Sequence, residues 1–197
     1  MNQNSQVTRF DPQLYRRAPW KNGGGVTVDI ADAYAPGVAP GSWSGMLWRF
    51  GRTEIVTAGP FSDLSGFDRI LTVIGGRGLL LDIEGGRTLD VREPYRPMRF
   101  RGEDRIVSRL EAGPVAVLNL MADRKRYVID VAIVGDGVVA LDGEINLVYA
   151  LEQSALDIGE GASLAPDETL RIEGAGRTLS VISGGVAFAK ISSRSAP

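Results

Sequence analysis

The sequence predicts an all-β protein made of two similar β-barrels with little helix, and three observations support this fold class. Short β-branched and leucine-rich runs recur at spacings of roughly 8 to 12 residues, as in sandwiches and barrels. Glycines separate these runs, and no long segment holds the apolar period of about 3.6 residues that a helix requires. A stretch of the first half also returns in the second half, which predicts a duplicated unit.

The N-terminal part of the chain predicts one helical turn and then strands. Asp11 followed by Pro12 is typical of a helix start, so we expect one short turn there. Residues 26–30 (VTVDI) and 46–50 (MLWRF) have the composition of strands. The Pro/Gly/Ala-rich segment Ala31–Gly41 is expected to be the loop between them.

Hairpins are expected through the rest of the chain. Between Arg69 and Val91, Gly-Gly pairs occupy turn positions between apolar runs, which is typical of β-hairpins. Further strands are predicted in the runs DRIVSRL (104–110), GPVAVLNLM (113–121), RYVIDVAIV (126–134), INLVYAL (145–151), TLRI (169–172) and TLSVISGGVAFAKI (178–191).

The internal repeat is the strongest evidence for two barrels. Leu81-Asp82-Ile83 returns 75 residues later as Leu156-Asp157-Ile158, and Ile70 meets Ile145 at the same offset. We therefore expect a duplication that packs as one cooperative unit.

A boundary between the two barrels is expected near Arg124 to Tyr127, where the charged run DRKR interrupts the apolar pattern. This predicts a first barrel over residues 1–125, which would hold the ligand pocket, and a second, smaller one over 126–197. The chain of 197 residues, 44% of them hydrophobic, is long enough for two such barrels.

Charge and composition exclude several classes of function. The net charge of −2 and the mixed signs give no basic face for nucleic acid or an anionic membrane, and neither partner is expected. We find no apolar stretch of membrane-spanning length and no signal peptide, so the protein is expected in the cytoplasm. The sequence leaves the oligomeric state open, with a homodimer as one option.

The absence of Cys and His is more informative. It excludes disulfides, thiolate chemistry, a Ser-His-Asp or Cys-His nucleophile and the commonest metal ligand. What remains is carboxylate, Lys, Arg or Tyr chemistry, a cation site with oxygen ligands alone, or no chemistry. We expect no catalytic residue, no metal and no cofactor.

The stretch PWKNGGG at 19–25 admits two interpretations. Asn22-Gly23 followed by Gly24 can form a tight turn and a bulge before the next strand. Alternatively, residues without a Cβ let backbone N–H groups approach an anion, while Lys21 supplies charge and Asn22 supplies a donor and an acceptor. The residues alone do not decide between the two.

Arg49 presents a similar choice because it lies between Trp48 and Phe50. Strand alternation sends Arg49 to one face and both aromatic side chains to the other. Arg49 is a surface residue if the aromatic side chains face the core, and it can bind a carboxylate if it faces a barrel interior.

Several blocks of the sequence, in this order and spacing, resemble the HutD/Ves family. They cover most of the first two thirds of the chain: APWKNGGGVT (18–27), WRF (48–50), GPFS (59–62), GFDR (66–69), FRGE (100–103) and LNLM (118–121). The resemblance implies a bicupin, that is, two fused cupin barrels, which agrees with the repeat. Metal-dependent cupins hold their ion with several His and a Glu, so a chain without His cannot reproduce that set.

The resemblance also implies an association with bacterial histidine utilisation, as a regulator that senses a small anion such as formylglutamate or urocanate. The alternative is a metal-independent cupin enzyme, an isomerase or a hydrolase, that acts on a small carboxylate. One departure concerns the residues before Asn119: family members often have Asp-Phe there, whereas this chain has Val117-Leu118. Any role that depends on that acid is in doubt.

With the family in view, we expect one ligand pocket in the first barrel. Lys21 and Arg69 would neutralise carboxylates, and an ion pair of Arg69 with Asp68 or Asp63 is the alternative for that residue. Two apolar walls and two orienting amides would complete the pocket. Its expected members are Lys21, Asn22, Gly23, Gly24, Trp48, Arg49, Phe61, Arg69 and Asn119.

Overall fold

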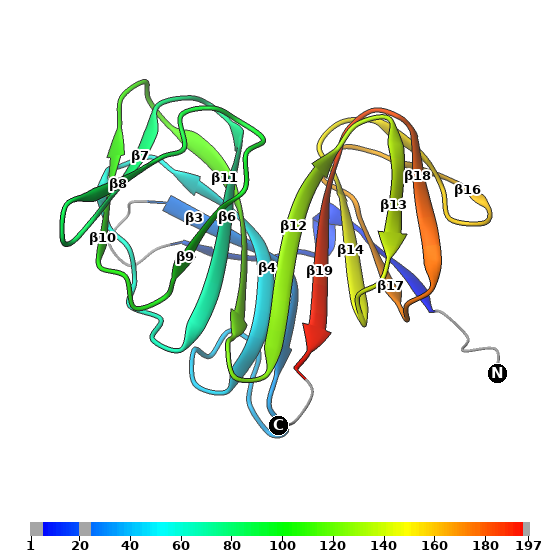
Figure 1. Cartoon of the computed structure of the whole chain (residues 1–197), viewed down its shortest axis with the longest axis horizontal. Helices are drawn as coiled ribbons and strands as arrows, with labels where there is room; N and C mark the ends of the chain where they lie inside the picture. The colour runs from blue at the N-terminus through cyan, green and yellow to red at the C-terminus, as the bar shows by residue number, and fades with distance from the viewer. Residues whose placement is uncertain (1–5, 20–24, 195–197) are drawn as a thin grey trace. The chain divides into compact units, whose positions relative to one another are not determined.

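Strands make up nearly all the regular structure of the chain in the computed structural model, which describes residues 6–19 and 25–194 (Figure 1). The exception in this part of the chain is a 3-10 helix, η1 (Pro12–Leu14), and the side chain of Asp11 caps it by accepting from the N–H of Gln13 at 2.8 Å. The expectations of an all-β chain and of a helical turn at this place are confirmed.

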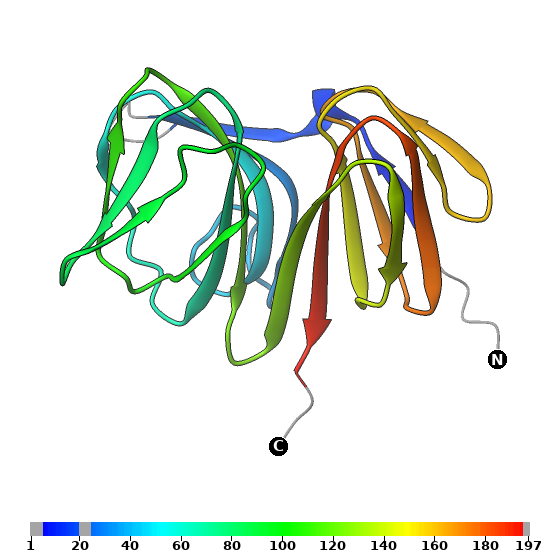
Figure 2. The same ribbon diagram turned by 45° about the horizontal axis from the view of Figure 1, so that its top comes forward.

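The described residues divide into two compact units. One unit, here called the N-terminal barrel, runs from Arg16 to Arg126, and the other, the C-terminal barrel, combines the residues up to Tyr15 with those from Tyr127 onward. The expected division into 1–125 and 126–197 therefore differs at the N-terminus, where β1 (Val7–Phe10) pairs with β17 (Thr169–Glu173) (Figure 2). A four-residue run such as VTRF does not specify a partner strand in sequence.

The N-terminal barrel consists of two sheets, one of six strands and one of four. Apolar side chains from both sheets meet between them, among them Leu71 and Val117 from the first sheet and Leu79 and Leu81 from the second, all fully buried. The six-stranded sheet has the order β2 (Arg16–Pro19), β3 (Gly25–Tyr34), β4 (Met46–Ile55), β11 (Val115–Asp123), β6 (Phe67–Gly75), β9 (Met98–Arg101), and the four-stranded sheet the order β5 (Gly59–Pro60), β10 (Ile106–Leu110), β7 (Leu79–Ile83), β8 (Arg87–Asp90).

The C-terminal barrel is also built from two sheets around an apolar core, here of Val148, Leu156, Leu179 and Phe188 with their neighbours. The five-stranded sheet has the order β1, β17, β14 (Ile145–Ala150), β19 (Val186–Ser193), β12 (Tyr127–Val134), and the four-stranded sheet the order β13 (Gly137–Leu141), β18 (Arg177–Ser183), β15 (Ser154–Asp157), β16 (Gly161–Leu164).

The same strand pairings occur in both barrels. In the N-terminal barrel β11 pairs with β6 and β10 pairs with β7, and in the C-terminal barrel β19 pairs with β14 and β18 pairs with β15. Leu81 and Leu156, which begin the repeated Leu-Asp-Ile motif, are both buried in their cores. The two halves are thus similar barrels, as the repeat predicts.

The loop expected at Ala31–Gly41 begins and ends four residues later than predicted. Strand β3 continues to Tyr34, because Ala31 pairs with Phe50 and Tyr34 with Met46 across to β4. The connection between the strands is therefore residues 35–45, and pairing with a neighbouring strand outweighs the weak local preference of Ala and Asp for a loop.

Candidate functional site

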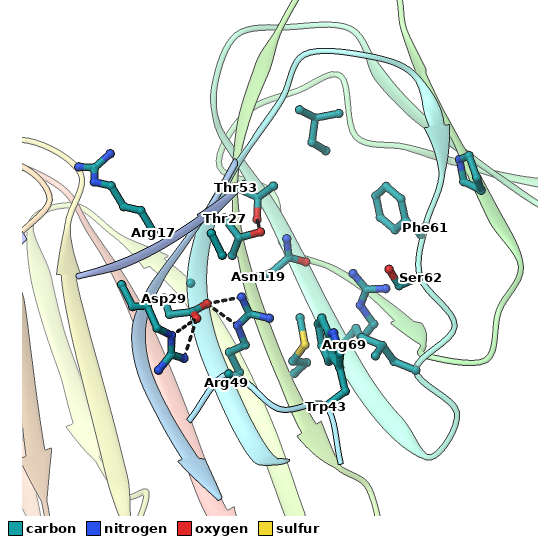
Figure 3. A pocket seen from close by; sticks show the side chains of 18 residues that line it. Arg17, Thr27, Asp29, Trp43, Arg49, Thr53, Phe61, Ser62, Arg69 and Asn119 are labelled. Atoms are coloured by element: carbon teal, nitrogen blue, oxygen red, sulfur yellow. Dashed lines mark hydrogen bonds and ion pairs between the residues drawn. The ribbon is translucent and has the colours of Figure 1, made fainter. Parts of the chain in front are cut away.

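A cavity of about 670 Å³ opens on the inner face of the six-stranded sheet of the N-terminal barrel (Figure 3). Residues of β2, β3, β4, β6 and β11 line it, together with others from the connections such as Phe61 and Trp43. Toward one end of this face the side chains are the apolar ones of the core, such as Ile55 and Val117. The rest of the face carries charges and amides, and this part forms the candidate site.

Strand register places the polar side chains in two adjacent rows. In the first row Arg49 of β4 pairs with Met121 of β11, which pairs with Arg69 of β6. In the second row Gly51 of β4 pairs with Asn119 of β11. Directly paired residues of an antiparallel sheet point to the same face, so both arginines and the amide project into the cavity.

A β-bulge in β3 adds two carboxylates to this face. Asp29 pairs with Gly51 but Ala31 already pairs with Phe50, so Ile30 is an extra residue in β3. Without the bulge, alternation would place Asp29 and Asp32 on opposite faces, three residues apart. With it, both carboxylates reach the guanidinium of Arg16 on β2.

Asp29 is the centre of this charged network. Its side chain is 4% exposed and accepts from Arg49 Nε at 2.5 Å on one oxygen and from Arg16 Nη2 at 2.7 Å on the other. Arg16 Nη2 also lies 2.5 Å from an oxygen of Asp32. Two guanidinium groups are therefore balanced by two carboxylates, and Arg49 is held in place toward the cavity.

Arg69 lacks such a balance. Its side chain lies over the rings of Phe61 and Phe100, at 5.2 and 4.9 Å from the ring centres, and the residue is 8% exposed. Its Nε has no hydrogen-bond partner within the described part of the chain. Burial, with the charge of Arg49 as a second cause, lowers the pKa of Arg69 to about 10, so the side chain is still cationic at neutral pH.

Asp68 and Asp63, the two acids that the sequence offered as ion-pair partners of Arg69, have other partners in the structure. Asp68 binds Arg124 at 2.5 Å on the other face of the sheet, and Asp63 accepts from the backbone and hydroxyl of Ser65. Neither acid pairs with Arg69, because alternation along β6 sends Asp68 and Arg69 to opposite faces.

Asn119 is the second buried polar group without a complete set of partners. The residue is 9% exposed, and within the described residues its Oδ1 accepts no hydrogen bond. The position opposite, Gly51, carries no side chain, and a Cβ there would lie 2.7 Å from the carbonyl oxygen of Val28. Only glycine therefore fits at this position, where the backbone of β3 comes close.

Four of the residues expected from the sequence line this one cavity: Arg49, Phe61, Arg69 and Asn119. Trp48 does not, and that expectation is corrected here: it is 1% exposed and points to the opposite face of β4 from Arg49. Strand alternation forbids both neighbours from lining the same cavity. Lys21, Asn22, Gly23 and Gly24 lie outside the described residues.

Sequence reasoning missed Asp29, Arg16 and Trp43. Trp43, which is half exposed, lies under the guanidinium of Arg49 at 5.1 Å and takes the place that we assigned to Trp48. The one available signal for Asp29 was indirect: an Arg on an inner face is costly without a counter-ion, so an acid was to be expected near it. Nothing in the local pattern identified Trp43 within its loop.

The residues that the structure describes contain neither a cluster of metal-ligating side chains nor a membrane-spanning helix. No three or more Asp or Glu side chains there are grouped so that they could hold a metal ion. In the same part of the chain, no helix is long and apolar enough to cross a bilayer.

Comparison with known proteins gives the family. The HutD family model matches residues 13–189. An uncharacterized 21.2 kDa protein in the hutC 3' region of Pseudomonas putida is 33% identical over 123 residues, which are 62% of this chain and 62% of that protein, less than two thirds of its length.

Two solved structures are similar over almost the whole chain. HutD from Pseudomonas fluorescens SBW25 has a TM-score of 0.83 at 29% identity, covering 96% of this chain and 100% of that one. A conserved protein of unknown function from Pseudomonas aeruginosa PAO1 has a TM-score of 0.84 at 23% identity, covering 95% and 99%, and shows the fold alone. The chain, with its two cupin barrels and its match to the family model along most of its length, belongs to the HutD family.

Proposed function

We propose that this protein is a non-catalytic regulator of histidine utilisation that acts in the cytoplasm. It would sense a small anionic metabolite, formylglutamate or urocanate, in the cavity of the N-terminal barrel. The observation that carries the proposal is Arg69, a buried cation with no carboxylate partner among the described residues.

The physical argument is one of charge compensation. A buried charge without a counter-ion is costly, so proteins usually pair it or expose it. Arg16 and Arg49 are paired with Asp29 and Asp32, which leaves Arg69 as the unbalanced buried charge of the site. A carboxylate of the ligand would supply the missing partner, and a guanidinium is well suited to bind it with two parallel hydrogen bonds.

The site supports binding better than catalysis. The acid at its centre, Asp29, is committed to two arginines, and a carboxylate held in this way is a poor general base. The chain has no His or Cys to act in its place. Apolar walls with a few fixed polar groups are the common pattern of a small-molecule binding site.

Calorimetric titration with urocanate and with N-formylglutamate tests the proposal. We expect at least one to bind, and Arg69→Met to weaken that binding by about 10- to 150-fold, since a charge-assisted hydrogen bond contributes roughly 1.5 to 3 kcal/mol. Arg101→Met is the matched control. Arg101 is exposed on β9, so this variant loses the same charge outside the cavity and should bind as the parent does.

The same samples separate a sensor from an enzyme. After long incubation with stoichiometric protein, the NMR spectrum of each metabolite should be unchanged. New resonances that depend on the protein would favour the isomerase or hydrolase. Absence of binding by both metabolites would overturn the proposed function.

A further inference from the structure

Two buried polar atoms at the inner end of the cavity have no hydrogen-bond partner, and one is a donor while the other is an acceptor. Arg69 needs an acceptor for its Nε, and Asn119 needs a donor for its Oδ1. Each residue is more than nine-tenths buried, so bulk water is a poor substitute for either partner.

The distance between the two groups follows from strand register. Asn119 pairs with Leu71, and Arg69 is two residues before Leu71 on the same face of β6, so the two are diagonal neighbours. Diagonal neighbours in an antiparallel pair lie about 7–8 Å apart, measured between their backbones. Both side chains line the same cavity, so a molecule with a carboxylate and an N–H or O–H only a few bonds away can contact both.

The surroundings leave room for such a molecule. Gly51, opposite Asn119, contributes no side chain, and Met121 lies between Arg69 and Arg49 in the adjacent row. The hydroxyls of Thr27 and Thr53, one row further in, bond to each other at 3.3 Å. The amide of Asn119 is therefore the polar group beside Arg69 that still lacks a partner at its oxygen.

We propose that the buried end of the ligand is a carboxylate with a hydrogen-bond donor close to it, the carboxylate bound by Arg69 and the donor by Asn119 Oδ1. This inference rests on the proposed function and narrows it, because it excludes plain carboxylates that carry no donor as the physiological ligand. Both metabolites named above satisfy it, urocanate through its ring N–H and N-formylglutamate through its amide N–H.

Two matched pairs of probes test the inference. 3-(2-Furyl)acrylate has nearly the shape of urocanate but no ring N–H, and N-formyl-N-methylglutamate lacks the amide N–H of its parent. Titrations are run above the pKa of an imidazole, so that urocanate is a monoanion. Whichever parent binds, we expect its donor-free partner to bind about 10- to 100-fold more weakly, since an unsatisfied buried acceptor is costly.

Variants assign the effect to one atom. In Asn119→Leu the acceptor is gone, so parent and donor-free probe should bind within about threefold of each other. In Thr53→Val, an isosteric loss of a hydroxyl that already has a partner in the same cavity, the difference between the probes should persist.

The possible results separate the two proposals. The inference is overturned if the unmutated protein binds a metabolite and its donor-free analogue equally well. It is also overturned if the difference between the two survives in Asn119→Leu. Either result leaves the proposed function standing. Failure of both urocanate and N-formylglutamate to bind overturns the proposed function and the inference together. Loss of the difference in Asn119→Leu alone supports both.

Discussion

The two barrels share the order of their four-stranded sheets and of four strands in their larger sheets, but they differ at one pair of inward-facing positions. Val117 pairs with Val73 in the N-terminal barrel and Phe188 pairs with Val148 in the C-terminal barrel, and these pairs are core. Two residues further along each strand, the N-terminal barrel has Asn119 opposite Leu71. The C-terminal barrel has Lys190 opposite Asn146 at the equivalent place.

Both polar side chains at this place in the C-terminal barrel have partners within the barrel. Asn146 is fully buried, accepts from the N–H of Gly143 at 3.2 Å, and donates to the carbonyl oxygens of Gly143, Ile172 and Gly174. Lys190 lies 3.0 Å from Asp142. A polar residue on an inner face is thus a structural element when its hydrogen bonds are complete, and a candidate for ligand binding when they are not.

The largest expected difference between the two barrels is in stability. The variant Asn146→Leu removes the partners of several buried backbone groups, so we expect its free energy of unfolding to fall by about 3 kcal/mol. Asn119→Leu removes an acceptor that has no partner, and should change it by less than about 1 kcal/mol. Urea unfolding of both variants measures the difference, and equal destabilisation would erase the distinction between the barrels.

Alkaline pH should act on the two barrels with opposite sign. Burial raises the pKa of Tyr15 in the C-terminal barrel to about 12, against about 10 in an unfolded chain. The stabilisation from its neutral form is complete below pH 10 and is lost as the pH rises toward 12. Arg69 has a lowered pKa, so the cost of its charge is present below about pH 10 and is relieved above it.

Urea unfolding on either side of pH 10 tests the sign expected for Tyr15. The Tyr15 hydroxyl donates to the carbonyl oxygen of Asp167 at 2.7 Å and lies 2.9 Å from the hydroxyl of Thr169, so Tyr15→Phe should be less stable than the parent at neutral pH. Phenylalanine cannot ionise, so the difference in the free energy of unfolding between parent and variant should narrow as the pH rises from 10 to 12. A gap that widens would show that the sign is wrong.

Arg69→Met should have a smaller effect on stability, and one in the unusual direction. Methionine keeps the contact with Phe61 and Phe100 but removes a buried charge that has no counter-ion. We expect the free energy of unfolding in the absence of ligand to rise by about 1 kcal/mol, although the same variant binds the ligand more weakly. A fall of the same size would mean that Arg69 is structural, like Asn146.

Much of the fold was predictable because strand signals and the repeat are local or periodic in sequence. The faces of β4 illustrate how far this extends: alternation correctly separates Arg49 from Trp48 and Phe50, but it does not tell which face lines a cavity. The bulge at Ile30, which aims Asp29 and Asp32 at the same arginine, depends on register with β4. Such a feature has no signature in one strand taken alone.

The candidate site was predictable in part for the same reason. Arg69 and Asn119 lie 50 residues apart and became neighbours only through the pairing of β6 with β11. The sequence blocks that contain them resemble the HutD/Ves family, and it was this resemblance that predicted one pocket for both residues. Trp43 lies in a loop, where neither periodicity nor pairing constrains its side chain, so no sequence signal placed it beside Arg49.

Trp43 provides the smallest expected effect and the most direct readout of the site. A cation–π contact at an exposed position contributes about 0.5 to 1 kcal/mol, and Asp29 holds Arg49 independently, so Trp43→Ala should weaken binding only about 2- to 5-fold. Trp43→Phe keeps an aromatic ring and should lose less. The chain has a third tryptophan, Trp20, so the emission experiment is done in a Trp20→Phe background. Because Trp43 is half exposed while Trp48 is fully buried, the ligand-dependent change of tryptophan emission should there disappear in Trp43→Ala but survive in Trp48→Phe. A change that survives in Trp43→Ala in this background would place the ligand away from Trp43 and Arg49, and would contradict the assignment of the site to this part of the cavity.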